Sequence, residues 1–281
     1  MPGELPSYST LRYERDGHVA HLVLDRPDKL NSFTMEMWHE LRDLGQRLLA
    51  EPDDLRAIVV IGEGRAFSSG IDTSVFSGDR SATDVISAGA EEPRHQDPTV
   101  AGILAIQDSY TWLEEAPFVS IAAVRGYAFG AGLQLAMACD LRVMARGAKV
   151  GILELKYGIL PDLGGTQRLP RLVGPARAKE LILTQARIDA DEAERIGLAE
   201  RVVSDEELEE TADALASTIA AAPPIAVRGV KRAVAAAMSG MSTRDGLVVE
   251  AEGQADCLRS DDMKEAIAAF VEQRDPVYRG R

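Results

Sequence analysis

The hydrophobic pattern of the first sixty residues changes period twice. Residues 9–27 alternate apolar and polar positions on both sides of an Asp-Gly pair, which predicts two strands joined by a tight hairpin turn. Residues 33–54 place apolar side chains three and four positions apart, so they predict a helix, with Thr34 as its N-cap. Residues 55–64 form a short apolar run that ends in a glycine turn, which indicates a buried strand.

The same order of patterns recurs further along the chain. Residues 99–117 have helical periodicity up to Pro117, and residues 118–126 are a buried strand. A glycine-rich turn and an apolar helix follow within residues 125–143, and residues 141–155 contain two more short strands. Strands that alternate with helices predict an α/β protein with a sheet core.

The pattern is almost wholly helical from residue 165 to Phe270, and two successive prolines at 223 and 224 separate two of these helices. We therefore expect a core over residues 1–200 and a helical C-terminal region over residues 201–281. That region is expected to pack on the core, between subunits, or both.

Residues 74–98 are polar, acidic and rich in small side chains. They predict a surface loop with room for a helical turn. Because this loop directly follows a glycine turn, it is a candidate lid, and a plain insertion is the alternative.

Composition excludes several classes of protein. With 31 basic and 45 acidic side chains the net charge is −14, which argues against nucleic acid or an anionic membrane as a partner. No apolar run is long enough to span a membrane, and the first residues have no signal-like core, so we expect a cytoplasmic protein. Cys139 lies in an apolar run and is predicted to be a buried thiol.

The sequence contains no GxGxxG after a strand, no GxxxxGK(S/T), no HExxH and no GxSxG. The four histidines lack the spacing of a metal site, so no metal is expected. Two glycine turns after buried strands remain, at residues 61–72 and 124–134. Glycine allows a ligand to approach the backbone closely, and the second turn opens a helix whose first N–H groups lack partners. Two such turns could direct two N–H groups at one oxygen, as an oxyanion hole does, or they could be plain strand–helix turns.

Three segments carry a resemblance to a known family: "GEGRAFSSGID", "RGYAFGAGLQLAMACD" and "LELKYGILPDLGGTQRLPRLVG". In this order and spacing they resemble the crotonase superfamily, the enoyl-CoA hydratase/isomerase family, over residues 10–275. The resemblance implies a crotonase-like (ClpP/crotonase) fold of repeated β-β-α units followed by a helical C-terminal region. It also implies an acyl-CoA thioester as substrate, a role in fatty acid metabolism, no cofactor beyond the CoA of the substrate, and a trimer or dimer of trimers.

The resemblance also implies which residues form the site. The backbone N–H groups of Ile71 and Ala131 should hold the thioester oxygen as an enolate forms. Ala131 replaces the glycine usual in the family, which requires a negative φ at that position. The residues expected along the substrate and CoA path are Arg26, Lys29, Leu30, Ser68, Ser69, Gly70, Asp72, Tyr127 and Gly130. Of the basic residues, Arg26, Lys29 and Lys156 are candidates for the mouth that receives the CoA phosphates.

The acid–base positions depart from the hydratase pattern of two glutamates. Gln134 stands at the first position and Glu154 at the second, with Asp162 eight residues later in "LPDLGG". A glutamine side chain hydrogen-bonds but does not exchange protons near neutral pH. The dienoyl-CoA isomerase branch has acids at all three positions, and this chain resembles it at the two later ones. By this resemblance Asp162 could orient Glu154 or raise its pKa. Asp162 could equally be a turn residue after Pro161.

One carboxylate suffices to move a proton between two carbons, whereas water addition needs both a base and an acid. The sequence therefore favours isomerisation of an enoyl- or dienoyl-CoA through Glu154. The first alternative is hydration of a trans-2-enoyl-CoA, with Gln134 holding the water. The second is an acyl-CoA-binding protein without turnover, and the negative charge disfavours the third, RNA binding.

Overall fold

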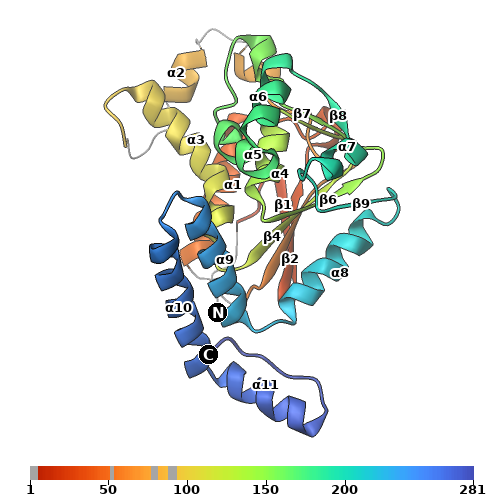
Figure 1. Cartoon of the computed structure of the whole chain (residues 1–281). Coiled ribbons are helices and arrows are strands. Elements are labelled where there is room, and N and C mark those ends of the chain that lie inside the picture. Colours follow the sequence, from red (N-terminus) through yellow and green to blue (C-terminus); the bar gives the residue numbers. More distant parts are fainter. Residues whose placement is uncertain (1–5, 51–53, 77–81, 88–93) are drawn as a thin grey trace.

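The computed structural model describes residues 6–50, 54–76, 82–87 and 94–281. Two sheets form its centre (Figure 1). The larger sheet has the strand order β1-β2-β3-β4-β6-β9 and the smaller one the order β5-β7-β8. The strands are β1 (Leu11–Asp16), β2 (Val19–Leu24), β3 (Ala57–Gly62), β4 (Val119–Val124), β5 (Tyr127–Phe129), β6 (Leu141–Ala145), β7 (Lys149–Gly151), β8 (Ile188–Asp189) and β9 (Arg201–Val203).

The α-helices are α1 (Met35–Ala50), α2 (Ala82–Ser87), α3 (Pro98–Glu115), α4 (Ala131–Ala138), α5 (Gly165–Val173), α6 (Pro175–Thr184), α7 (Ala190–Arg195), α8 (Leu208–Ala220), α9 (Pro224–Met238), α10 (Thr243–Arg259) and α11 (Asp261–Glu272). The described residues also form three short 3₁₀ helices: η1 (Pro27–Lys29), η2 (Thr73–Phe76) and η3 (Glu154–Tyr157). Among the residues that the structure describes, no helix is long and apolar enough to cross a membrane.

The first strands and helix form where the sequence predicts them. β1 and β2 pair antiparallel, and Gly17 between them has φ +56°, a conformation that suits glycine. Thr34 accepts a hydrogen bond from Met37 N through its hydroxyl, which confirms it as the cap of α1. From β2 onward the neighbours in the larger sheet run parallel.

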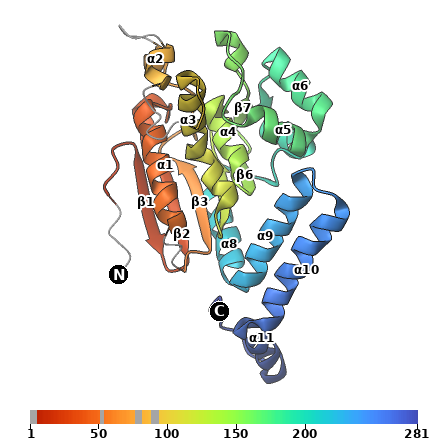
Figure 2. The same ribbon diagram turned by 90° about the vertical axis from the view of Figure 1, so that its left-hand side faces the viewer.

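Both faces of the larger sheet are covered, which explains why β3 is apolar at every position. Ile58 and Val60 point into the core that includes α1, α3 and α4, whereas Val59 and Ile61 pack towards α8 on the other face. Figure 2 shows α1 and α3 in front of the first strands. Cys139 lies in the first of these cores, as predicted, and burial raises its pKa to about 12.

The chain beyond residue 165 is less uniformly helical than its pattern predicts. β8 pairs with β7, and β9 joins the larger sheet beside β6, so the prediction of helix at these positions is wrong. Val202 and its neighbours gain their strand structure from pairing with β6, a contact between residues almost sixty positions apart. With β9 and α8 the sheet layers continue past residue 200, where the core was expected to end.

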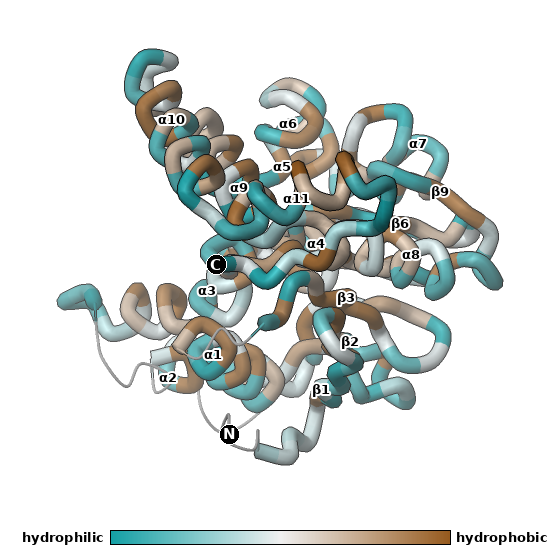
Figure 3. Tube along the Cα trace, turned by 90° about the horizontal axis from the view of Figure 1, so that it is seen from below, coloured by the Kyte–Doolittle hydropathy of each residue, from teal (hydrophilic) through white to brown (hydrophobic). Residues whose placement is uncertain are grey.

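Helices α9, α10 and α11 extend away from the sheets (Figures 1 and 2). Apolar and polar positions alternate along α9 and α10 (Figure 3). Lys231 fastens α9 to the core, because its Nζ atom donates to Leu113 O at 2.7 Å and Phe118 O at 2.9 Å and pairs with Asp140 at 2.9 Å. Many large apolar side chains on these helices are exposed: Val230, Val234, Met238, Leu247, Val248, Leu258, Ile267, Phe270 and Val271.

Candidate active site

The two glycine turns predicted as a site meet in the structure. β3 and β4 are parallel neighbours, so the turns that follow them leave the same edge of the sheet. Ser68 pairs with Ala128 across the turns, and an added Cβ on Gly70 would lie 2.9 Å from Phe129 O. Gly70 has φ +100°, so only glycine fits the backbone at this close approach.

Gly130 shapes the second turn. Its φ of +51° and ψ of −119° are accessible to glycine and strained for other residues, and its conformation starts α4 at Ala131. Ala131 is absent from the residues with positive φ, so an alanine is tolerated at this position. As the first residue of α4, it has an N–H group for which the helix offers no acceptor.

The N–H group of Ile71 is also available. The neighbouring groups are used: Gly70 N–H donates to Ser68 Oγ at 3.2 Å, and Asp72 N–H donates to Phe33 O at 2.9 Å. Within the part of the chain that the structure describes, no acceptor is found for the N–H of Ile71 itself. Among the described residues, both predicted donors therefore lack acceptors, as an oxyanion hole requires.

Gln134 and Glu154 lie side by side in the interior. Gln134 Nε2 donates to Glu154 Oε1 at 2.6 Å, and Gly165 N–H donates to Gln134 Oε1 at 2.8 Å. These two bonds fix which end of the amide faces the acid. The other carboxylate oxygen, Glu154 Oε2, is buried and has no hydrogen-bond partner in the described parts of the chain. Gly130 adjoins the same group, since a Cβ added there would lie 3.0 Å from Glu154 Oε1.

Burial sets the proton affinity of Glu154. Removal from water raises its pKa, the hydrogen bond from Gln134 partly opposes this, and the charge of Asp162 adds to the increase. Burial also raises the pKa of Asp162. The structure therefore brings Gln134 and Glu154 into contact, and the charge of Asp162 contributes to the raised pKa of Glu154.

The loop that carries Asp162 is held by side chains that the sequence did not single out. Gln107 Nε2 donates to Asp162 O at 2.6 Å, and Arg168 Nη1 donates to Leu163 O at 2.7 Å. Together with the bond from Gly165 to Gln134, they fix three residues of the segment 162–165. Gln107 lies on a helix with no local motif. Arg168 lies within the segment 153–174 that carries the resemblance, but its residue type does not indicate that it binds a backbone carbonyl of this loop.

Some of the residues predicted along the CoA path bind the protein's own backbone, and others are exposed at the surface. Ser68 and Ser69 bind the backbone of residues 29–31: Ser68 Oγ donates to Asn31 O at 2.7 Å and Ser69 N–H donates to Leu30 O at 2.9 Å. Ser68 is fully buried, so its hydroxyl serves the fold. Tyr127 is 41% exposed and stacks on Phe129, and Lys29 and Lys156 are exposed.

Arg26 and Asp72 pair with each other. The guanidinium lies 3.1 Å from Asp72 Oδ2 and also binds Ser32 O. Burial by itself raises the pKa of the Asp72 carboxyl group. Hydrogen bonds from Ser74, Arg26 and Ser32 outweigh this effect and lower the pKa to about 2. The charge of Arg26 is thus largely offset, which leaves Lys29 and Lys156 as the exposed cations among the three candidates for the mouth.

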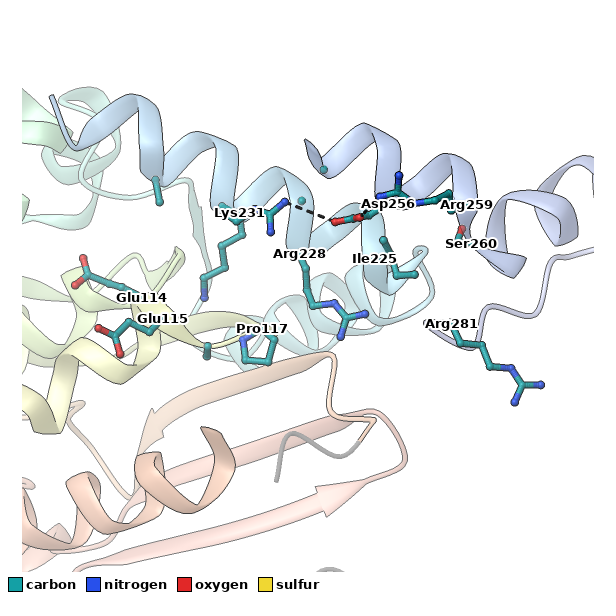
Figure 4. A pocket seen from close by; sticks show the side chains of 15 residues that line it. Glu114, Glu115, Pro117, Ile225, Arg228, Lys231, Asp256, Arg259, Ser260 and Arg281 are labelled. Atoms are coloured by element: carbon teal, nitrogen blue, oxygen red, sulfur yellow. Dashed lines mark hydrogen bonds and ion pairs between the residues drawn. The ribbon is translucent and has the colours of Figure 1, made fainter. Parts of the chain in front are cut away.

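A separate cavity of about 820 Å³ lies between α9, α10 and the end of α3 (Figure 4). Glu115 and Pro117 on its wall precede β4, whereas the glycine turns follow β3 and β4, so the cavity lies at the opposite edge of the sheet. Its Arg232 and Arg259 share Asp256 as an ion-pair partner. It is therefore distinct from the site around Glu154.

Comparison with known proteins identifies the family. A family model for enoyl-CoA hydratase/isomerase matches residues 14–281, and this chain belongs to that family, with the crotonase fold. A crotonyl-CoA hydratase of Syntrophomonas wolfei is 35% identical over 271 residues, 95% of this chain and 97% of that protein. The peroxisomal Δ3,5-Δ2,4-dienoyl-CoA isomerase of Arabidopsis thaliana is 34% identical over 278 residues, 98% of each chain.

A solved structure agrees with these relatives. A Thermobifida fusca protein, crystallised in complex with acetoacetyl-CoA, superposes with a TM-score of 0.80 at 39% identity. The match covers 89% of this chain and 95% of that one. These comparisons include both hydratases and an isomerase, so they establish the family and leave open which of the two reactions this enzyme catalyses.

Proposed function

We propose that this enzyme isomerises the double bond of an enoyl- or dienoyl-CoA, with Glu154 as the single proton carrier. In a 3-enoyl-CoA the Glu154 carboxylate takes a proton from C2, and the electron pair moves into the thioester as an enolate. The N–H groups of Ile71 and Ala131 stabilise the enolate oxygen. Glu154 then returns the proton to C4, and the double bond ends between C2 and C3.

The observation that carries this proposal is the set of bonds made by Gln134. Its carbonyl oxygen accepts from Gly165 and its amide nitrogen donates to Glu154. The bonds orient Glu154 so that Oε2 is the oxygen left for proton transfer. A carboxylate with a raised pKa is a suitable base for a carbon acid, because the optimum lies near the working pH.

An acyl-CoA thioester as substrate is supported by the family and by the Thermobifida fusca structure with acetoacetyl-CoA. The reaction uses no cofactor beyond the CoA of the substrate. The exposed apolar side chains of α9–α11 support a homo-oligomer, which sedimentation of the intact protein would measure.

Hydration of a trans-2-enoyl-CoA is the second candidate, and relatives such as the crotonyl-CoA hydratase of Syntrophomonas wolfei favour it. In that reaction Glu154 would have to activate the water and also supply the proton. Gln134 would have to hold the water with the second hydrogen of its amide, because its oxygen is bound to Gly165.

The test is incubation in D₂O with 3-enoyl-CoA, 3,5-dienoyl-CoA and crotonyl-CoA, followed by mass and ultraviolet spectrum. We expect a double-bond shift without the mass gain of water, and its loss in Glu154→Gln. Water addition to crotonyl-CoA at a comparable rate would establish the hydratase instead. Binding of all three esters without turnover or deuterium uptake would indicate a binding protein.

A further inference from the structure

Three buried aromatic residues lie behind the two glycine turns. Phe33, Trp38 and Tyr110 are 0%, 3% and 0% exposed. The ring of Phe33 stacks on Trp38 at 5.8 Å and meets the edge of Tyr110 at 5.7 Å. These three residues form the aromatic cluster, and each of the two proposed oxyanion donors is attached to it by hydrogen bonds.

The attachment of Ile71 runs through the backbone of Phe33. Phe33 N–H donates to Gly70 O at 2.8 Å, and Phe33 O accepts from Asp72 N–H at 2.9 Å. In a trans peptide the C=O and the following N–H point in opposite directions. Because Gly70 O points at Phe33, the N–H of Ile71 points away from Phe33, and both sides of Ile71 are held.

The attachment of Ala131 runs through the side chain of Tyr110. The Tyr110 hydroxyl donates to Ala131 O at 3.1 Å and accepts from Trp38 Nε1 at 3.3 Å. On the other side, Gly130 N–H donates to Gly151 O at 2.9 Å. The peptide group that carries the Ala131 N–H thus lies between two anchored groups.

We propose that Tyr110 is a positioning residue for the oxyanion hole and that the aromatic cluster sets the spacing between its two donors. This inference rests on the proposed role of the Ile71 and Ala131 N–H groups. Packed rings have little freedom to shift. Phe33 holds the backbone on both sides of Ile71, whereas Ala131 is held by Tyr110 on one side and by the backbone hydrogen bond of Gly130 on the other. Both donors therefore keep their direction as charge develops on the substrate. The hydroxyl acts through Ala131 and does not itself touch the substrate.

The test compares wild-type protein with Tyr110→Phe, which removes one hydroxyl and keeps the ring. The probe is butyryl-CoA with a ¹³C-labelled thioester carbonyl, whose stretching frequency falls when N–H donors polarise it. We expect wild-type protein to lower this frequency and Tyr110→Phe to lower it less. With the enoyl-CoA substrate, kcat should fall about 10-fold with little change in KM, less than the roughly 100-fold loss when a whole donor is removed.

Tyr8→Phe is the matched control, because it also removes a tyrosine hydroxyl that makes a side-chain hydrogen bond, here to Asp43 at 2.8 Å. It should leave the carbonyl frequency and kcat unchanged. Trp38→Phe removes the bond to the Tyr110 hydroxyl and should give a smaller effect than Tyr110→Phe.

Equal carbonyl frequencies in wild-type protein and Tyr110→Phe, with both saturated by butyryl-CoA, would overturn the inference. An unshifted band in wild-type protein would overturn it as well, since there would be no polarising donors to position. Butyryl-CoA has no double bond to move, so the probe is independent of turnover. A shifted band weakened in Tyr110→Phe, without isomerisation of any enoyl-CoA, would support the inference and overturn the proposed reaction.

Discussion

Gln134 Nε2 lies 2.6 Å from Glu154 Oε1, so an amide faces the buried acid where hydratases of the family are expected to place a second carboxyl group. The amide donates a hydrogen bond and keeps its protons. This one relationship separates a site with one proton carrier from a site with two, and it makes the choice between isomerase and hydratase open to experiment.

Gln134→Glu should convert the site towards hydration. The new carboxyl can still accept from Gly165 N–H, and together with Glu154 it provides an acid and a base. We expect the rate of water addition to crotonyl-CoA to rise about 100-fold, the lower end of what a general acid or base contributes. Gln134→Leu is the control and should show no such gain. A folded Gln134→Glu protein with an unchanged hydration rate would show that a second carboxyl is insufficient here.

The pH dependence of kcat/KM should report the pKa of Glu154. The base must be ionised, and burial raises its pKa, so activity should appear at a pH above the ordinary glutamate value of about 4.3. The bond from Gln134 stabilises the ionised form, so Gln134→Ala should move the acidic limb to still higher pH. Gln167→Ala removes an exposed amide and should leave the profile unchanged. An identical limb in Gln134→Ala would disprove the role of this bond.

Gly130→Ala should damage both the backbone and the acid. A φ of +51° with ψ of −119° costs an alanine about 2 kcal/mol, and its Cβ would lie 3.0 Å from Glu154 Oε1. We expect kcat to fall about 100-fold, as small displacements of catalytic groups do. Gly147→Ala is the control, since a Cβ there meets nothing within 4 Å. Unimpaired turnover in Gly130→Ala would mean that the turn adjusts without moving Glu154.

Lys231→Met should loosen the attachment of α9. The substitution leaves Asp140 without its cation and two backbone carbonyls without a donor. We expect a loss of about 2 kcal/mol in the free energy of unfolding, measured by urea denaturation. Lys264→Met removes an exposed ion pair and should change stability by less than about 0.5 kcal/mol. Equal stability of the two variants would show that Lys231 is not an anchor.

Elements with a strong local pattern were predictable from the sequence. The hairpin at Gly17, the Thr34 cap and the apolar run of β3 each depend on neighbouring residues, and each forms as expected. β9 was missed because its three residues become a strand by pairing with β6, and no local period marks that contact.

The candidate site also has features that the sequence predicted and features that it did not. The resemblance indicated that Gln134 and Glu154 belong together, and the structure places them in contact. The bond from Gly165 to Gln134 and the pair formed by Arg26 and Asp72 depend on how loops meet in space, so residue types alone could not reveal them. Tyr110 was missed because a tyrosine on an apolar helix reads as an ordinary core residue.

The hydrogen bonds between Phe33 and the residues on both sides of Ile71 affect which substitutions position 71 can accept during evolution. Phe33 holds the backbone on both sides of residue 71 through main-chain atoms, so the N–H group there keeps its direction whatever side chain is attached. Codon changes at position 71 can therefore alter a side chain that packs against the hydrophobic core while the proposed donor survives. Proline is the exception, because it removes the N–H itself.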